Sequence, residues 1–397
     1  MQKRVKLIEC GFCQSFVPGD QLSPAMLSAV LTFLFSQNFL LCVLLLSPVM
    51  YFVLNSIVPL LLGSQDLKKK YGATWGLVTG SSSGIGKELA RKLLYQGIDV
   101  ILVARDEPVF DETVADLRKL FPNRQVLQVG ANLSEANGTW MENVKAAVGD
   151  KSVQVVFLNA GYIVTGMFEQ NEAGAHLANL HCNLTANVHL CHYLYSRMLA
   201  KAQRGCVVFT SSSASYIPNP FAVLYGTTKA AVSAFAASLA VEGRARGIHV
   251  HAIHPSPVNS RFSSGGGNSV KVRKIDAMDQ FYKFASGPEV LPDKFFSHIG
   301  RGAVVADLGG VRCPPPYRGC GRCASVAHHP PYPTSSLLSH SIPPIPHHPT
   351  CTSPSQVSMM LRMVVHVLGY NLMAFATAVT APLMPDYQNN VAKAKKS

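Results

Sequence analysis

The chain has 397 residues and a formal net charge of +13, with 35 lysines and arginines against 22 acidic residues. No basic helix and no basic-aromatic module occurs, and the basic residues are scattered along the sequence, so we expect no nucleic-acid partner. We instead expect a cytosol-facing surface near anionic lipid that attracts phosphate-bearing ligands. The ten cysteines are dispersed, which argues against a disulfide framework and favours buried free thiols.

Two Cys-x-x-Cys pairs, Cys10 with Cys13 and Cys320 with Cys323, have the spacing of zinc ligands. They lie near opposite ends of the chain, and such short patterns often occur by chance. We therefore predict no metal site.

The N-terminal region, 1–65, holds a stretch without charged residues from Gln21 to Gln65. Its most apolar part, Phe39 to Leu62, is long enough to cross a bilayer, which requires about 20 apolar residues. A signal peptide has a shorter apolar core, and a core helix is rarely apolar on every face. We predict a membrane anchor over about 25–63, as a hairpin or as one tilted pass. Because lysine and arginine flank both ends, both should face the cytosol.

Residues 66–312 form the predicted catalytic domain. Short β-branched runs alternate there with amphipathic stretches of helical length, which is typical of repeated βαβ units. The pattern predicts an α/β fold with a doubly wound, Rossmann-type parallel sheet of about seven strands. The expected strands are Trp75–Val78, Asp99–Val103, Gln125–Val129, Gln154–Leu158, Cys206–Thr210, His249–Ile253 and Ala303–Val305.

The C-terminal part changes character twice. Residues 313–356 are rich in proline, histidine and serine and lack periodicity, so we expect a disordered insertion or a retained intron. Residues 357–397 contain an apolar helix, either a further span, an interfacial helix or a cover over the substrate, and a basic tail. Lys393 and Lys395 in that tail resemble a dilysine retrieval signal of the endoplasmic reticulum.

A glycine-rich turn follows the first expected strand and begins a helix. Glycines let the backbone turn sharply and approach a pyrophosphate, whose charge lies at the helix N-terminus. The strand, the spacing and the helix together predict a dinucleotide site at Gly80, Ser82, Ser83, Gly84, Ile85 and Gly86. At the end of the second strand, Arg105 favours the 2′-phosphate of NADP(H), whereas Asp106 keeps NAD open.

A tyrosine and a lysine at helical spacing form the candidate catalytic pair. Tyr225 and Lys229 are four residues apart, so they share one face of a helix. An ammonium group beside a phenol stabilises the phenolate, which makes Tyr225 a plausible proton donor to a carbonyl oxygen. Ser212, at the end of the fifth expected strand, would polarise that carbonyl, although the choice over Ser211 and Ser213 depends on spacing alone.

These motifs together resemble the short-chain dehydrogenase/reductase family over about Lys69 to Gly310. Tyr71-Gly72-x-x-Trp75 resembles the subgroup of membrane-bound very-long-chain 3-oxoacyl-CoA reductases and related 17β-hydroxysteroid dehydrogenases. The resemblance implies that Tyr225 is the acid/base, that Lys229 also bonds the nicotinamide ribose, and that Asn183 holds a water in the proton relay. It further implies cofactor contacts from Asn132, Asn159, Ala160, Gly161, Pro255 and Val258.

We therefore expect NADPH-dependent reduction of a hydrophobic ketone, foremost a 3-oxoacyl-CoA of fatty-acid elongation. The alternatives are a steroid, retinoid or 3-ketosphinganine oxidoreductase, and an inactive NADP-binding membrane scaffold. The intact serine, tyrosine and lysine set argues against the scaffold. We expect the endoplasmic reticulum membrane as the location, with the catalytic domain facing the cytosol and membrane lipid as a partner. A homo-oligomer stays open.

Overall fold

The computed structural model describes residues 58–255, 257–262, 285–301 and 305–308, and isolated residues between 25 and 54 and between 380 and 389. The chain divides into two compact units, Met1–Tyr51 and Phe52–Ser397, and every element below belongs to the second. Most of the predicted anchor, the insertion at 313–356, most of 357–397 and both Cys-x-x-Cys pairs lie outside the described residues. Among the residues that are described, no helix combines the length and apolar character needed to cross a bilayer.

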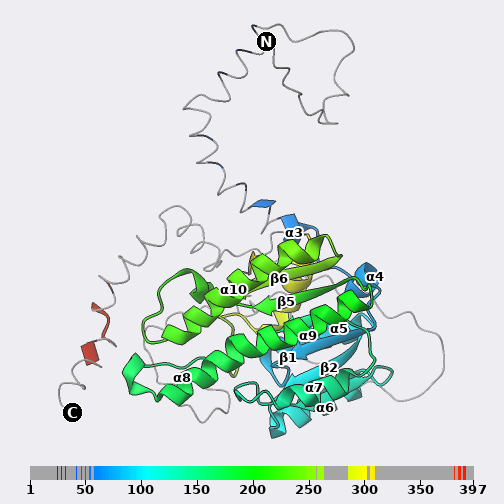
Figure 1. Ribbon diagram of the computed structural model, residues 1–397, viewed down its shortest axis with the longest axis horizontal. Coiled ribbons are helices and arrows are strands. Elements are labelled where there is room, and N and C mark those ends of the chain that lie inside the picture. The colour runs from blue at the N-terminus through cyan, green and yellow to red at the C-terminus, as the bar shows by residue number, and fades with distance from the viewer. Residues whose placement is uncertain are drawn as a thin grey trace, which may run out of the picture. The chain divides into compact units, whose positions relative to one another are not determined.

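A seven-stranded parallel sheet in the order β3-β2-β1-β4-β5-β6-β7 forms the centre of the fold (Figure 1). The prediction of a doubly wound parallel sheet is therefore confirmed. Its strands are β1 (Trp75–Thr79), β2 (Asp99–Ala104), β3 (Val126–Gly130), β4 (Val153–Leu158), β5 (Gly205–Thr210), β6 (Ile248–Pro255) and β7 (Val305–Leu308). The strand order reverses between β1 and β4, and ligands of such sheets bind beyond the carboxyl ends at that point.

The seventh strand is described from Val305 to Leu308, and its predicted start at Ala303 lies outside the described residues. β7 is an edge strand that pairs with β6 alone. Before it, the backbone N–H of Gly300 donates to Nε2 of His251 on β6 at 2.8 Å. This contact holds the chain in a turn before β7 starts.

Helices cover both faces of the sheet. The chain forms α3 (Val58–Leu61), α4 (Leu67–Tyr71), α5 (Gly84–Tyr95), α6 (Pro108–Leu120), α7 (Trp140–Val148), α8 (Ala173–Leu180), α9 (Ala186–Ala200), α10 (Val223–Arg244) and α12 (Leu291–His298). Short 3-10 turns occur at Phe168–Gln170, Ser213–Tyr216 and Pro288–Val290, and a π-helical turn at His181–Thr185.

Two apolar clusters, one on each face, form the core. One contains side chains of α7, α9 and α10, and the other contains side chains of α4, α5, α6 and α12. Along β4, Val156 and Leu158 join the first cluster, whereas Val155 and Phe157 join the second. This alternation is the reason why β4 is apolar from Val155 to Leu158, since a strand buried on both faces needs no polar side. The thiols of Cys182, Cys191 and Cys206 are buried and free, as predicted.

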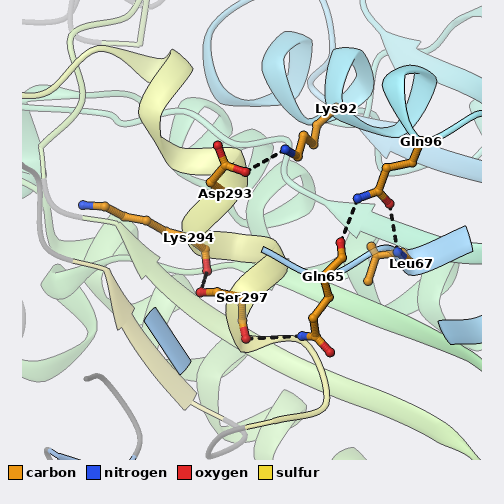
Figure 2. Close-up of polar contacts among 7 residues, drawn as sticks. All are labelled: Gln65, Leu67, Lys92, Gln96, Asp293, Lys294 and Ser297. Carbon is orange, nitrogen blue, oxygen red and sulfur yellow. Dashed lines mark hydrogen bonds and ion pairs between the residues drawn. The ribbon is translucent and has the colours of Figure 1, made fainter. Parts of the chain in front are cut away.

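A polar clamp joins the segment before α4 to α5 and α12 (Figure 2). Nε2 of buried Gln65 donates to the carbonyl oxygens of Phe296 and Ile299, each at 2.8 Å, and to that of Ser297 at 3.2 Å. The carbonyl oxygen of Gln65 in turn accepts from Nε2 of Gln96 at 2.7 Å. Because the last carbonyls of a helix lack partners within it, Gln65 satisfies the C-terminal end of α12.

Candidate active site

The glycine-rich turn between β1 and α5 is as compact as predicted. Gly80 and Gly84 have φ angles of +64° and +58°, a conformation that side chains other than glycine disfavour. A Cβ atom on Gly86 would lie 2.2 Å from the carbonyl oxygen of Gly80. A Cβ atom on Gly80 would lie 2.8 Å from the Cα atom of Ala160. These close approaches require glycine at the turn.

The N-terminus of α5 suits an anion. α5 has 12 residues, and its N-cap residue Ser83 makes no side-chain hydrogen bond to the first turn. The N–H groups and the positive end of the helix dipole therefore form the kind of place where a pyrophosphate binds. Ser82 is held from the side, because Oγ1 of Thr113 on α6 donates to its carbonyl oxygen at 2.7 Å. Ile85 packs partly against the core, so its side chain anchors the turn.

Asn159 connects the ends of three strands beneath this turn. Its backbone N–H donates to Oγ1 of Thr79 at 2.9 Å, and its Nδ2 donates to the carbonyl oxygen of Thr79 at 3.2 Å. Its Oδ1 accepts from Oγ1 of Thr210 at 3.0 Å. Ala160 shares the Thr79 hydroxyl through its own N–H at 2.9 Å. The predicted Asn-Ala-Gly turn thus packs directly against the glycine turn.

Two arginines flank one carboxylate at the ends of β2 and β6. Nη2 of Arg105 lies 2.5 Å from Oε1 of Glu107, and Nη1 of Arg261 lies 3.9 Å from Oε2 of the same side chain. The Asp106 carboxylate points away toward Gly130, where an added Cβ would lie 2.0 Å from Oδ1. Of the two acidic residues that follow Arg105, Glu107 is therefore the one that meets the arginines, and the sequence analysis did not single it out.

Asn132 takes part in a local turn after β3. Its Nδ2 donates to Oε1 of Glu135 at 3.0 Å, and its Oδ1 accepts from the N–H of Ser134 at 3.2 Å. Beyond β6, Val258 forms a bridge to Ser286 and packs against the second core cluster. The loop that follows Pro255 reaches the glycine turn, since a Cβ on Gly84 would lie 3.2 Å from Cβ of Ser260.

Tyr225 and Lys229 lie together on α10, as their spacing predicts. Nζ of Lys229 lies 5.7 Å from the centre of the Tyr225 ring. The lysine is 3% exposed, and its Nζ donates to the carbonyl oxygen of Thr210 at 2.7 Å. Burial lowers the pKa of Lys229 to about 8, while the nearby Cys182 thiol acts in the opposite direction. Tyr225 is partly exposed, and its ring centre lies 5.7 Å from that of Phe262.

The structure distinguishes two of the three neighbouring serines. The buried Ser211 hydroxyl donates to the carbonyl oxygen of Lys229 at 2.9 Å and lies 2.7 Å from Oγ of Ser233. Ser212 is partly exposed, and its Oγ accepts a hydrogen bond from the N–H of Ala214 at 3.2 Å. The Ser211 hydroxyl is thus used to hold α10 against the end of β5. Ser212 is therefore the better placed of the two to contact a substrate carbonyl.

Asn183 lies close to Lys229, in the π-helical turn between α8 and α9. Its amide bonds to both backbone groups of Tyr162, accepting from N–H and donating to the carbonyl oxygen, each at 3.0 Å. A Cβ on Gly161 would lie 3.1 Å from Oδ1 of Asn183 and 3.3 Å from Nζ of Lys229. Glycine at 161 therefore allows the amide and the ammonium to approach each other, and π-helical turns frequently mark functional sites.

One polar network beneath the site escaped the sequence analysis. Nε2 of buried His254 on β6 lies 2.8 Å from Oγ of Ser233, which also donates to the carbonyl oxygen of Lys229 at 2.8 Å. The His254 ring also lies 4.8 Å from that of Tyr216. The sequence signal for this network is the histidine at the end of an apolar strand, because a buried polar side chain needs a hydrogen-bond partner.

Comparison with known proteins agrees with this geometry. The family model of short chain dehydrogenases matches residues 74–267. A very-long-chain 3-oxoacyl-CoA reductase-like protein of Arabidopsis thaliana is 29% identical over 252 residues, which are 62% of this chain and 74% of that protein. A very-long-chain 3-oxoacyl-CoA reductase of Caenorhabditis briggsae is 30% identical over 51% of this chain and 65% of its own length. A hydroxysteroid dehydrogenase-like protein 1 of Gallus gallus is 26% identical over 52% of this chain and 62% of its own length.

Solved structures share the fold. A 7β-hydroxysteroid dehydrogenase superposes with a TM-score of 0.53 at 23% identity, covering 62% of this chain and 91% of that one. A short-chain dehydrogenase of Burkholderia phymatum, solved with NAD, superposes with a TM-score of 0.51 at 22% identity, covering 59% of this chain and 88% of that one. The family match over residues 74–267, the glycine turn and the Tyr225–Lys229 pair thus make this chain similar to the short chain dehydrogenases, in sequence and in fold.

Proposed function

We propose that the chain is an NADP(H)-dependent reductase of a hydrophobic ketone, foremost a long-chain or very-long-chain 3-oxoacyl-CoA. The observation that carries the proposal is the position of Lys229. Its Nζ lies 5.7 Å from the centre of the Tyr225 ring and 3.3 Å from where a Cβ on Gly161 would be, next to Ala160, which packs against Gly80 of the glycine turn. The substrate class is supported by the names of the plant and nematode relatives, of which the matched part spans about two thirds.

The residues of this chain would divide the work as follows. The bound nicotinamide supplies a hydride for the carbonyl carbon. Ser212 donates a hydrogen bond that orients the carbonyl, and Tyr225 donates the proton to its oxygen. The Lys229 ammonium stabilises the phenolate that forms on Tyr225. Asn183 lies near that ammonium and would keep a water in the path by which the proton is replaced.

Preference for NADP(H) over NAD(H) is supported by the two arginines at Glu107. A phosphate on the adenine ribose would compete with the Glu107 carboxylate for the two guanidinium groups, and charge-assisted hydrogen bonds from arginine to phosphate are strong. Fluorescence titration of the wild type and of Arg105→Leu with NADPH and NADH tests this assignment. We expect NADPH binding to weaken about tenfold to a hundredfold and NADH binding to stay the same. An equal loss for both cofactors would contradict the assignment.

The activity itself is tested with purified full-length protein and a panel of ketones. We expect NADPH oxidation with 3-oxoacyl-CoA, with chain-length dependence, and a much lower rate with Tyr225→Phe. A steroid substrate is the second candidate, because one relative is named as hydroxysteroid dehydrogenase-like; retinoids and 3-ketosphinganine complete the panel. No turnover with any of these would favour the inactive scaffold.

We also propose location at the endoplasmic reticulum membrane with the catalytic domain in the cytosol. The uncharged stretch from Gln21 to Gln65 and the lysines at 393 and 395 support this proposal. Protease protection of the tagged chain in intact microsomes tests it. Digestion of the catalytic domain without detergent is expected, and full protection would contradict the cytosolic orientation.

A further inference from the structure

Basic residues that are scattered in the sequence gather at one edge of the sheet. In a parallel sheet, the amino ends of all strands lie on the same side of the sheet, and the segments that precede the strands lie there too. The segments before β1, β4, β5, β6 and β7 are 66–74, 149–152, 201–204, 242–247 and 299–301. They hold nine basic and three acidic residues. We call these five segments, at the amino ends of the strands, the basic edge.

Contacts among these residues show that they are neighbours in space. The Tyr71 hydroxyl lies 2.9 Å from Nδ1 of His249, which joins the segment before β1 to the start of β6. Nζ of Lys70 donates to the carbonyl oxygen of Ile299 at 2.6 Å, which joins it to the segment before β7. Burial lowers the pKa of His249, and the charges of Lys70, Arg204 and Arg244 lower it further. The cations of Lys70, Arg204 and Arg244 are therefore close enough to His249 to disfavour a further positive charge there.

The opposite edge, which carries the active site, has the reverse balance. Within 80–87, 104–107, 130–137, 159–172, 211–222 and 257–262 there are three basic and five acidic residues. Among the described segments, the excess of positive charge thus lies away from the cofactor groove. Attraction of a phosphate-bearing cofactor does not account for it.

Exposed leucines adjoin the basic edge. Leu61 is 80% exposed and Leu62 is 60% exposed. Nη1 of Arg301 donates to the carbonyl oxygen of Leu62 at 3.2 Å and to that of Gly63 at 2.6 Å. These contacts hold the two leucines beside the cationic side chains. A partner is needed that accepts apolar side chains and positive charge at the same time, and this combination fits a lipid interface better than a purely polar polyanion.

We propose that the basic edge docks on the surface of an anionic lipid bilayer, with Leu61 and Leu62 inserted at the headgroup level. Each lysine or arginine near an anionic leaflet adds to the attraction, and salt screens it. The docking would turn the opposite edge, with Ser212 and Tyr225, away from the membrane surface. This inference does not depend on the reductase activity. Leu61 and Leu62 are the last residues of the apolar N-terminal run, so the proposal adds an electrostatic contact of the catalytic domain to the predicted anchor.

Flotation of the full chain with vesicles of two compositions tests the proposal. One contains phosphatidylcholine alone and the other contains phosphatidylcholine with phosphatidylserine. Insertion of the N-terminal run alone would bring the chain to both kinds of vesicle equally. If the chain floats with neither, the predicted anchor and the docking are both wrong. The basic edge is expected to add binding to the anionic vesicles that raised salt removes. Equal binding to both compositions at low salt would overturn the proposal.

Paired charge reversals locate the effect. Arg204→Glu with Arg244→Glu, both exposed on the basic edge, should weaken the anionic component at least about tenfold. Lys119→Glu with Lys145→Glu on α6 and α7 changes the net charge equally and should weaken it far less. Equal losses in the two pairs would show that net charge alone matters.

Lys69→Glu with Arg244→Glu serves as a second edge variant should the first fail to fold, as judged by circular dichroism. Binding to an RNA oligomer that is tighter than binding to anionic vesicles at the same salt concentration would assign the edge to nucleic acid instead.

Discussion

Lys229 donates a hydrogen bond from Nζ to the carbonyl oxygen of Thr210 at 2.7 Å, which connects the catalytic helix α10 to the end of β5. The lysine is buried at this position, and Nζ still lies 5.7 Å from the centre of the Tyr225 ring. One side chain thus aligns α10 with the sheet and places a cation next to the proposed proton donor.

The pH dependence of ketone reduction should report this lysine. Burial lowers the pKa of Lys229 to about 8 from 10.5, so the ammonium is present below about pH 8 and is lost above it. The neutral amine stabilises a phenolate less, and we expect kcat/KM for the ketone at saturating NADPH to fall as the pH rises through this value. In Lys229→Arg the guanidinium stays charged, so the alkaline fall should disappear even though turnover is lower. The same alkaline fall in both proteins would assign it to another group.

The same shift has a consequence for stability with the opposite dependence on pH. The folded protein binds the Lys229 proton less tightly than the unfolded chain, so the buried ammonium destabilises the fold at neutral pH. This destabilisation is complete below about pH 8 and is relieved between about pH 8 and 10.5. Lys229→Met, which has no charge to bury, should therefore unfold at higher urea concentration at pH 7. A lower midpoint would show that the bond to Thr210 outweighs the cost of burial.

Replacing Tyr225 by phenylalanine should separate chemistry from cofactor binding. The substitution removes the hydroxyl and keeps the ring that lies 5.7 Å from Phe262. We expect the turnover rate to fall by about 10²-fold or more, with NADPH affinity nearly unchanged. Tyr193→Phe on α9, whose ring contacts Arg197, is the matched control and should keep full turnover. Retained turnover in Tyr225→Phe would mean that another group donates the proton.

Local patterns were sufficient for the fold and for the parts of the site that lie within one element. The strands are short and rich in β-branched residues, and Tyr225 and Lys229 are one helical turn apart, so local patterns placed them. The contact of Lys229 with Thr210 joins two elements, and nothing in the spacing of these residues indicates it. The same is true of Arg261 beside Glu107, since their loops follow β6 and β2, which are not adjacent in the sheet.

Burial decided what spacing left open. Ser211 and Ser212 are adjacent in the sequence, but their side chains leave a strand end in different directions. Only the structure shows that the Ser211 hydroxyl bonds to the carbonyl oxygen of Lys229. The basic edge likewise combines segments that are far apart along the chain. The net charge predicts an excess of positive charge but not where on the fold that excess lies.

The glycine turn offers a matched pair of substitutions. An alanine Cβ at Gly86 would lie 2.2 Å from the carbonyl oxygen of Gly80 and 2.9 Å from Nδ2 of Asn159. The turn would have to open, so Gly86→Ala should weaken NADPH binding and lower stability by about 1–3 kcal/mol. Gly174→Ala in the first turn of α8 meets no atom within 4 Å and should bind and unfold as the wild type does. Cofactor titration and urea denaturation measure both effects, and equal behaviour of the two variants would refute the close approach at Gly86.

Gln65 should contribute to stability through the clamp on α12. Its Nε2 is the donor for three backbone carbonyls around the end of that helix, and the side chain is 8% exposed. Gln65→Glu keeps the shape but replaces the donor by a carboxylate that faces the same carbonyl oxygens. Nζ of Lys70 donates to Oε1 of Gln65 and to the carbonyl oxygen of Ile299, each at 2.6 Å, so the carboxylate would keep this partner. The carbonyl oxygens of Phe296 and Ser297 would lose their donor, and we expect Gln65→Glu to destabilise the protein by about 1–3 kcal/mol and Gln65→Ala by at least as much. Gln128→Glu, whose amide bonds to Asp111 at the surface, is the control and should change stability by less than about 1 kcal/mol. Urea midpoints for the three variants decide the matter, since an unchanged midpoint for Gln65→Glu would show that water replaces the glutamine at the end of α12.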